Sequence, residues 1–322
     1  MSQSASTQAH KPLPRPAAIS LTDRAVIRVS GAQADTFLQG QFSQNLADVT
    51  EAFSPRAAAC NPKGRAYCLT RLVRDGEDVL LDLPVESADA ITGHLRKYLM
   101  LFRGTTMAVE ESARITGLLG DEIADRLYPA AAQQLLRPGD SVKTASGHLI
   151  RTENTADGLA RYEFWQTRRS DSSPLDTATG GSLADWYGSE IAAGVARLTL
   201  ASHDAYVPQM LNWQHVGGIH FKKGCYTGQE VIARMHFLGQ LKKSLFRLTA
   251  STLAEVPESG QAILAGDRAV GEVVNAVGYD DGSVELLAVL RHDAANQALT
   301  VDGMGAVALA PLPLPYQVPE RE

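Results

Sequence analysis

The residues of this chain most suited to chemistry lie in one short segment of its second half. The segment is Phe221-Lys222-Lys223-Gly224-Cys225-Tyr226-Thr227-Gly228-Gln229-Glu230. Thr227 and Glu230 have the spacing of a capping box, which predicts a helix that begins near Gly228. Cys225 would then lie just before the helix N-terminus, where free N–H groups and the helix dipole favour an anion.

Two lysines and a glycine support the prediction of a reactive thiol at Cys225. Lys222 and Lys223 place positive charge close to the sulfur in sequence, and Gly224 lets a ligand approach the backbone closely. These neighbours are expected to lower the pKa of the thiol toward neutrality. The alternative interpretation is that Cys225 is a small buried side chain beside a helix, which is the usual fate of a free cysteine.

The helix predicted after Gly228 should bury one apolar face, formed by Val231, Ile232, Met235 and Leu238. Its surroundings are basic, because residues 222–247 carry a net charge of +5 in a chain whose net charge is −6. A polyglutamate tail, a phosphate or an RNA backbone would suit such a patch. A solvated helix face with lysines at a strand edge would explain the same charges without a partner.

Other well-known catalytic and cofactor motifs do not occur in the sequence. There is no G-x-G-x-x-G, P-loop or G-x-S-x-G motif. His215, His220 and Cys225 are spaced by fives, which matches no known zinc motif, so no metal site is predicted. The three cysteines are too few for the four thiolates of a common iron–sulfur cluster and, being odd in number, do not suggest a disulfide framework. We expect Cys60 and Cys68 to be buried.

Length and composition indicate an ordinary globular protein of about two domains. The chain has 322 residues, of which 44% are hydrophobic and 20% charged, so disorder, collagen and coiled coil are excluded for the chain as a whole. No apolar run approaches the roughly 18 residues of a membrane helix. Residues 1–17 are polar and Pro-rich, which predicts a flexible tail rather than a secretory signal. We therefore expect a cytoplasmic protein that does not contact membranes.

Periodicity predicts an α+β fold with an all-β C-terminal part. Strands are expected at 25–29, 66–73, 79–83, 113–119 and 161–165, and helices at 31–42, 85–102 and 123–135. Residues 169–182 should form a loop. Beyond residue 241 only short strands are expected, at 245–248, 269–274 and 284–290. The predicted domains are an α+β region over 18–240, a β-module over 241–312 and a tail over 313–322.

The segment Lys223–Glu230 resembles the signature K-G-C-Y-x-G-Q-E of the YgfZ family. The resemblance continues upstream through Val207-Pro208-Gln209, Asn212 and Gly217-Gly218-Ile219. Weaker traces are Gln39-Gly40-Gln41, Lys63-Gly64 and Lys97-Tyr98. The likeness therefore extends from about residue 21 to residue 312 and is dense only in 207–247.

This resemblance implies a fold and a function. The family is similar to the T-protein, the aminomethyltransferase of the glycine cleavage system, which implies two intertwined α+β subdomains and a C-terminal β-barrel around a central channel. It further implies a tetrahydrofolate-binding accessory protein that supports assembly or repair of iron–sulfur clusters in client enzymes, tRNA-modifying ones included. Two alternatives stay open: a folate-dependent aminomethyltransferase-like enzyme, and an RNA-binding module that acts on tRNA through residues 222–247.

The resemblance also assigns roles to individual residues. Cys225 corresponds to the family's functional cysteine, with Lys223 beside it as a second candidate catalytic residue. Trp186 matches the family's folate-stacking tryptophan, although a core anchor would look the same in sequence. Arg24 stands where the family has a second tryptophan, and could stack on a ring or pair with a glutamate tail. The remaining candidate folate-binding residues are Gln209, Asn212, Tyr226, Gln229 and Glu230.

One departure from the family pattern bears on catalysis. The acidic residue of the family's I-E-A-G segment is replaced by Ala192, with Glu190 two positions earlier. Loss of that carboxylate removes a partner for the N–H donors of a pterin. The sequence therefore argues against aminomethyl transfer.

Overall fold

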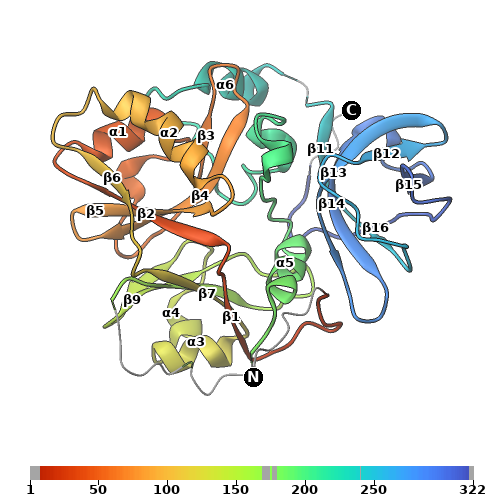
Figure 1. Cartoon of the computed structure of the whole chain (residues 1–322), viewed down its shortest axis with the longest axis horizontal. Coiled ribbons are helices and arrows are strands. Elements are labelled where there is room, and N and C mark those ends of the chain that lie inside the picture. The colour runs from red at the N-terminus through yellow and green to blue at the C-terminus, as the bar shows by residue number, and fades with distance from the viewer. Residues whose placement is uncertain (1–7, 169–174, 176–179, 240, 319–322) are drawn as a thin grey trace.

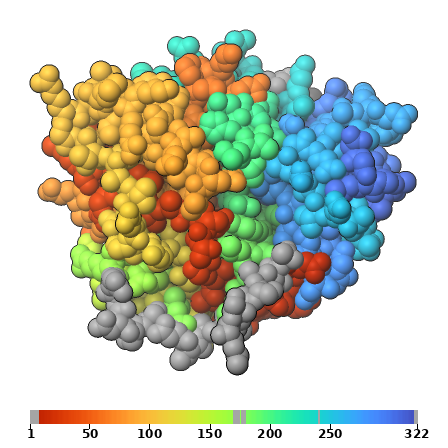
Figure 2. All heavy atoms as spheres, in the orientation of Figure 1, coloured from red at the N-terminus to blue at the C-terminus, as the bar shows by residue number. Residues whose placement is uncertain are grey.

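The computed structural model describes residues 8–168, 175, 180–239 and 241–318, in which three antiparallel sheets are arranged around a central helix (Figure 1). This helix, α5 (Leu183–Ala192), begins at a capping box in which Ser182 Oγ accepts from Asp185 N at 3.2 Å and Asp185 Oδ2 accepts from Ser182 N at 2.7 Å. In the space-filling view, the green segment that begins with α5 lies between the orange and the blue parts of the molecule (Figure 2).

The first sheet has the strand order β3-β4-β5-β2-β6. Its strands are β2 (Arg24–Ser30), β3 (Arg56–Cys60), β4 (Ala66–Asp75), β5 (Asp78–Pro84) and β6 (Thr106–Val109). Helices α1 (Ala34–Gln41) and α2 (Ala88–Leu99) bury Phe37, Leu38, Ile91 and Leu95 in one core with this sheet. These two helices were predicted at 31–42 and 85–102. The structure confirms both, and each is shorter than predicted.

The second sheet has the order β1-β7-β10-β9-β8. Its strands are β1 (Ala17–Ser20), β7 (Arg114–Leu119), β8 (Ser141–Lys143), β9 (Gly147–Arg151) and β10 (Arg161–Gln166). The short helices α3 (Asp121–Leu127) and α4 (Ala131–Gln134) share a core with one face, and α5 with the other. The single helix predicted over 123–135 is wrong, because Ala130 adopts a left-handed conformation (φ 59°) that separates α3 from α4.

The third sheet is a curled half-barrel with the order β15-β12-β13-β14-β11-β16. Its strands are β11 (Lys243–Ala250), β12 (Ala262–Ala265), β13 (Arg268–Gly278), β14 (Val284–Arg291), β15 (Leu299–Val301) and β16 (Ala310–Leu312). Register shifts at Ile263/Leu264 and Val273/Asn275 are bulges of the kind that help a sheet to curl.

The remaining short elements connect the half-barrel to the rest of the chain. They are η1 (Leu46–Asp48), η2 (Leu200–Ser202), η3 (Pro208–Leu211), α6 (Gln229–Phe237) and η4 (His292–Ala294). One apolar core contains residues of α5, η3 and α6 together with half-barrel residues such as Val274 and Leu287. The half-barrel therefore packs against α5, η3 and α6, which connect it to the other two sheets.

The described parts of the two predicted tails are attached to the core. Ala9 is buried, donates its N–H to Gly278 O and accepts from Asp280 N, both at 2.9 Å. Near the C-terminus, the Tyr316 hydroxyl donates to Gly194 O at 2.7 Å. The predicted flexible tail (1–17) and C-terminal tail (313–322) thus both contain residues that contact the core. Most of the predicted loop at 169–182 lies outside the described residues.

Candidate functional site

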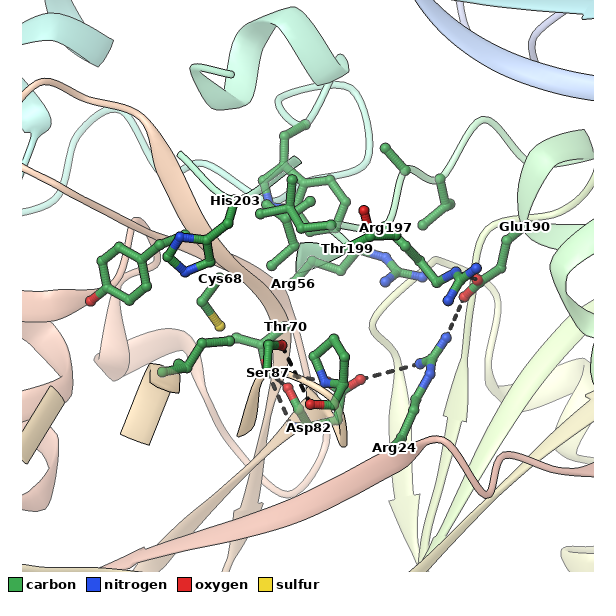
Figure 3. Close-up of a pocket in the computed structure, with 18 of the residues that line it drawn as sticks. Arg24, Arg56, Cys68, Thr70, Asp82, Ser87, Glu190, Arg197, Thr199 and His203 are labelled. Carbon is green, nitrogen blue, oxygen red and sulfur yellow. Dashed lines mark hydrogen bonds and ion pairs between the residues drawn. The ribbon is translucent and has the colours of Figure 1, made fainter. Parts of the chain in front are cut away.

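A pocket lies beside the first sheet and α5, and we call it the central pocket (Figure 3). It contains about 640 Å³ of empty space, its open mouth included. Its lining includes several charged side chains, among them Arg24 from β2, Asp82 from β5, Glu190 from α5 and Arg197 from the segment after α5.

Arg24 joins two carboxylates that line the central pocket. Its guanidinium donates to Asp82 Oδ2 at 3.2 Å and to Glu190 Oε1 at 2.5 Å, and it also lies 3.3 Å from Glu163 Oε1. Burial opposes its charged form, but attraction to Glu190, Asp82 and Glu163 raises the pKa of Arg24 above its usual value. Arg24 is therefore a fixed positive charge whose donors are already used within the protein.

A deeper layer of ion pairs supports these lining residues. Glu163 Oε2 accepts from Arg71 Nε at 3.1 Å and from Trp165 Nε1 at 3.0 Å. Arg56 binds Glu153 through two hydrogen bonds of 2.9 and 2.7 Å. Burial would raise the pKa of both glutamates, but the arginines lower it below its usual range. Both acids therefore stay ionised in the folded protein.

One oxygen of Glu190 remains available to a ligand. Its Oε2 is buried, lies 3.5 Å from Arg197 Nε and accepts no hydrogen bond within the described residues. Arg197 lies over the ring of Tyr187, with its guanidinium carbon 3.6 Å from the ring centre. A buried oxygen without a hydrogen bond costs about 1–3 kcal/mol. Glu190 Oε2 is therefore a ready acceptor for a ligand N–H group.

Aromatic side chains form another wall of the central pocket. Trp213 is buried there, with the guanidinium carbon of Arg56 5.7 Å from its ring centre. Tyr67 and His203 also line the pocket, with ring centres 6.0 Å apart. Burial raises the pKa of the neighbouring Cys68 thiol well above its usual value, so this thiol is neutral. Trp213 is 1% exposed and Tyr67 is 3% exposed, so only the edges of these rings reach the pocket.

The loop that carries the K-G-C motif lies apart from this pocket. Cys225 is exposed and is not among the residues that line the central pocket. Gly228 has φ 85°, and a Cβ there would lie 2.6 Å from Asn61 O in the β3–β4 turn. A Cβ on Gly64 would likewise meet Val231 of α6 at 2.6 Å. Glycine at both positions thus lets the turn and α6 approach closely.

Lys223 is half-buried and fixed to the end of α1. Its Nζ donates to Gln39 O at 2.6 Å and to Phe42 O at 2.5 Å, and it lies 4.8 Å from the ring centre of Tyr226. Burial lowers the pKa of the Lys223 amine to about 7. A neutral amine still has two N–H donors, which suffice for both carbonyls. Lys223 therefore holds the motif loop against α1.

The predicted capping box at Thr227 and Glu230 is not formed. Helix α6 does begin at Gln229, but Gly228 is its N-cap and no side chain caps it. Thr227 instead donates its backbone N–H to Gly40 O at 3.1 Å, while Gln229 Oε1 accepts from Tyr226 N at 3.1 Å. Docking of the loop on α1 thus replaces the local cap, and Glu230 is exposed.

The apolar face predicted for α6 is also only partly correct. Ile232 is buried, and Val231 and Met235 are half-buried, whereas Leu238 is 86% exposed. The neighbouring Phe237 is 65% exposed. The final turn of α6 therefore extends beyond the core that covers its middle.

Trp186 lies in the hydrophobic core. It is fully buried, and a Cβ on Gly117 would lie 2.3 Å from its ring. Arg161 covers it, with the guanidinium carbon 4.4 Å from the ring centre. No ring face is left for a pterin, so the structure contradicts the expected stacking role, and Trp213 is the tryptophan that lines the central pocket.

Gln209 in η3 and Asn212 at its C-terminal end connect this helix to its neighbours. Gln209 Nε2 donates to Ile232 O of α6 at 2.7 Å, and Asn212 Nδ2 donates to Leu245 O of β11 at 2.9 Å. Both are buried, and neither lines the central pocket. Of the seven residues predicted to bind folate, only Arg24 lies in that pocket's lining.

Three charged residues in or beneath the central pocket that sequence reasoning missed carry a recognisable signal. Arg71, Asp82 and Glu163 each interrupt an otherwise apolar strand. A charge at such a position must find a buried partner, and here these charges pair with one another or with Arg24. Trp213 and Arg197 lie outside regular elements and give no comparable signal.

Two further findings concern metal-binding groups and membrane-spanning helices. Within the described ranges, no three histidine, cysteine or acidic side chains are grouped closely enough to hold a metal ion. No helix among the residues that the structure describes is both long and apolar enough to cross a membrane.

Comparison with solved structures defines the class of protein. The fold is similar to that of the glycine cleavage system aminomethyltransferase T from Bartonella henselae, with a TM-score of 0.71 and 16% identity over 96% of this chain and 87% of that one. The chain therefore has the fold of this aminomethyltransferase, which is the fold that the resemblance to the T-protein implied.

Sequence comparison finds relatives that match nearly the full length of this chain. Proteins named "tRNA-modifying protein YgfZ" from Escherichia coli O6:K15:H31 and Shigella boydii serotype 4 are each 29% identical over 94% of this chain and 94% of their own length. No family model matches the chain. The motif and the similarity along nearly the full length agree, and both support the resemblance to the YgfZ family.

Proposed function

We propose that this protein binds a tetrahydrofolate in the central pocket and supports assembly or repair of iron–sulfur clusters in client enzymes. Tetrahydrofolate is absent from the structure, so the fit rests on the pocket's own groups. The observation that carries the proposal is Glu190 Oε2, a buried acceptor in the lining of the central pocket that accepts no hydrogen bond within the described residues. A pterin offers N–H donors along one edge, which is what this oxygen requires.

The other pocket groups suit the remaining parts of a folate. The edges of Trp213 and Tyr67 in the pocket lining would contact the rim of a flat ring. Arg197 has 29% of its side chain exposed, whereas Arg24 has 8%. We therefore assign the anionic glutamate tail to Arg197 near the mouth, in place of the role expected for Arg24.

Binding is favoured over aminomethyl transfer by the state of the lining carboxylates. Asp82 and Glu190 pair with Arg24, and Asp23 lies 3.7 Å from Arg197. A carboxylate that is held in an ion pair with an arginine is committed to that contact and is poorly placed to act on a substrate. We therefore propose a folate-binding accessory protein, with the transferase as the less favoured alternative.

We assign contact with the iron–sulfur client to Cys225. Its thiol is exposed on a surface loop, whereas Cys60 and Cys68 are buried. A client protein can therefore reach this sulfur without opening the fold. The relatives' printed name concerns tRNA modification, and we propose that tRNA-modifying enzymes are among the clients. A cytoplasmic location is part of the same proposal.

The folate proposal is tested by titrating the protein with tetrahydrofolate in an anaerobic calorimeter. Glu190→Gln should weaken binding about 10- to 150-fold, because one charged acceptor is worth about 1.5–3 kcal/mol. Glu153→Gln is the matched control, since it also breaks a buried ion pair but does not line the pocket. Equal affinities for the wild type and Glu190→Gln would refute the assignment.

The role of Cys225 is tested separately in cells that lack the endogenous protein. Cys225→Ser should fail to restore the activity of an enzyme with a labile iron–sulfur cluster during oxidative growth. Exposed Ser112, changed to Ala, provides a control on a surface away from the motif. Full complementation by Cys225→Ser would remove the thiol from the proposal and leave the folate site untouched.

A further inference from the structure

A second pocket lies between α6 and the half-barrel, and we call it the α6–barrel pocket. Its lining includes Gln209 and Gln214 beside η3, Met235 and His236 on α6, and His292 of η4. It contains about 710 Å³ of empty space, its open mouth included. It shares no lining residue with the central pocket. In Figure 1, α6 lies at the top of the molecule and the start of β11 lies on its half-barrel side.

Two buried amide oxygens in this pocket lack hydrogen bonds. Gln209 is 4% exposed, and its Nε2 donates to Ile232 O, which fixes the orientation of the amide. Its Oε1 accepts nothing within the described residues, and neither does Gln214 Oε1. Unpaired buried acceptors are costly, so the pocket is suited to a ligand that presents N–H donors.

The imidazoles that line the pocket are held in place by aromatic stacking. His236 stacks on Phe221 with ring centres 3.6 Å apart at 11°, and His215 stacks on Tyr316 at 5.3 Å and 12°. His292 Nε2 is 2.8 Å from Ser244 Oγ. These rings therefore form fixed edges and faces, which favour a planar ligand over a flexible one.

The charge distribution separates the interior of this pocket from its surroundings. None of the described lining residues has a carboxylate, ammonium or guanidinium group, and burial lowers the pKa of His215, which keeps that ring neutral. Beside the lining residues in sequence, Arg234 and Lys242 are exposed and Lys243 is half-exposed. A neutral, N–H-bearing ring thus matches the interior, and a phosphate matches the surroundings.

We propose that the α6–barrel pocket binds a nucleotide, with its base in the pocket and its phosphate near Arg234, Lys242 and Lys243. The amide oxygens of Gln209 and Gln214 would accept hydrogen bonds from the base, while Met235 and the histidines would contact its ring. This assignment goes beyond the folate proposal and uses other residues. The same chemistry is present in a free nucleotide and in a nucleotide of an RNA strand.

The test is calorimetric titration of the full chain with the four ribonucleoside 5′-monophosphates, the corresponding nucleosides and a tetraribonucleotide. At least one monophosphate should bind. Met235→Trp, which fills the pocket, should abolish this binding, whereas Met100→Trp makes the same substitution on an exposed site elsewhere and should not change it. Gln214→Leu should weaken binding about 3- to 10-fold, as expected for one hydrogen bond.

Two further measurements separate the contribution of the base from that of the phosphate, and binding of a free nucleotide from binding of RNA. Lys242→Glu should weaken binding of the monophosphate and leave the nucleoside unchanged, with Arg126→Glu on α3 as a control. Tetranucleotide binding about tenfold tighter than that of the monophosphate would identify RNA as the source, and equal affinities a free nucleotide. Binding of inorganic phosphate alone, no binding at all, or binding that survives Met235→Trp would each overturn the proposal.

Discussion

Replacing Glu163 with glutamine should destabilise the whole fold, because this residue connects two arginines beneath the central pocket. Its oxygens lie 3.1 Å from Arg71 and 3.3 Å from Arg24, and it also accepts from Trp165 Nε1. The glutamate is fully buried. A neutral amide cannot balance either guanidinium, so the substitution leaves buried positive charge without a full counterpart.

The expected loss can be worked out from the burial of the pair. Removing one partner of a buried ion pair costs about 3–5 kcal/mol. An unfolding entropy of about 2.1 cal/mol/K per residue gives roughly 0.7 kcal/mol/K for 322 residues unfolding together. Glu163→Gln should therefore lower Tm by about 4–7 °C.

Differential scanning calorimetry at pH 7 provides the assay. The exposed Glu111→Gln is the control and should leave Tm unchanged within about 1 °C. Adding Arg71→Met to Glu163→Gln should cost less than the sum of the two single changes, because the unpaired charge is removed with its partner. A Tm for Glu163→Gln within about 1 °C of the wild type would refute the reasoning.

Three further predictions concern the motif and the N-terminal segment. Under native conditions a maleimide should modify Cys225 alone, and mass spectrometry should find two more reactive thiols only after denaturation; rapid native modification of all three would contradict the burial pattern. The Lys223 amine, labelled by reductive ¹³C-methylation, should titrate near pH 7, and a midpoint near pH 10 would show that burial does not govern it. The His10 imidazole hydrogen-bonds to Asp185, and this contact raises the pKa of the imidazole. The contact should therefore stabilise docking of the N-terminal segment fully below about pH 6.5. This stabilisation should be lost as the pH rises through the raised pKa of His10. Hydrogen-exchange protection of the Ala9 amide should fall over that rise, and pH-independent protection would remove this role for His10.

Local patterns in the sequence predicted the elements that bury apolar residues at regular spacing. The strand predicted at 79–83 is β5 (Asp78–Pro84), and the strand predicted at 161–165 is β10 (Arg161–Gln166). Strand β3 was missed because Arg56–Cys60 consists mostly of alanine, which has low strand propensity. It forms a strand because β4 pairs along its length.

The site was harder to predict because its chemistry depends on tertiary contacts. Whether Trp186 presents a ring face depends on Arg161 and Gly117, which lie on other elements. The partners of Arg24 are up to 166 positions away in sequence. The motif predicted a cysteine just before a helix, but the link of its loop to α1 through Lys223 follows only from the fold.

A crystal structure of the protein with tetrahydrofolate tests the central proposal most directly. It should show the pterin in the central pocket, with a ring N–H within about 3.2 Å of Glu190 Oε2, its ring beside Trp213 and its glutamate near Arg197. An ordered folate bound elsewhere on the protein, with the central pocket filled only by water, would contradict the proposal.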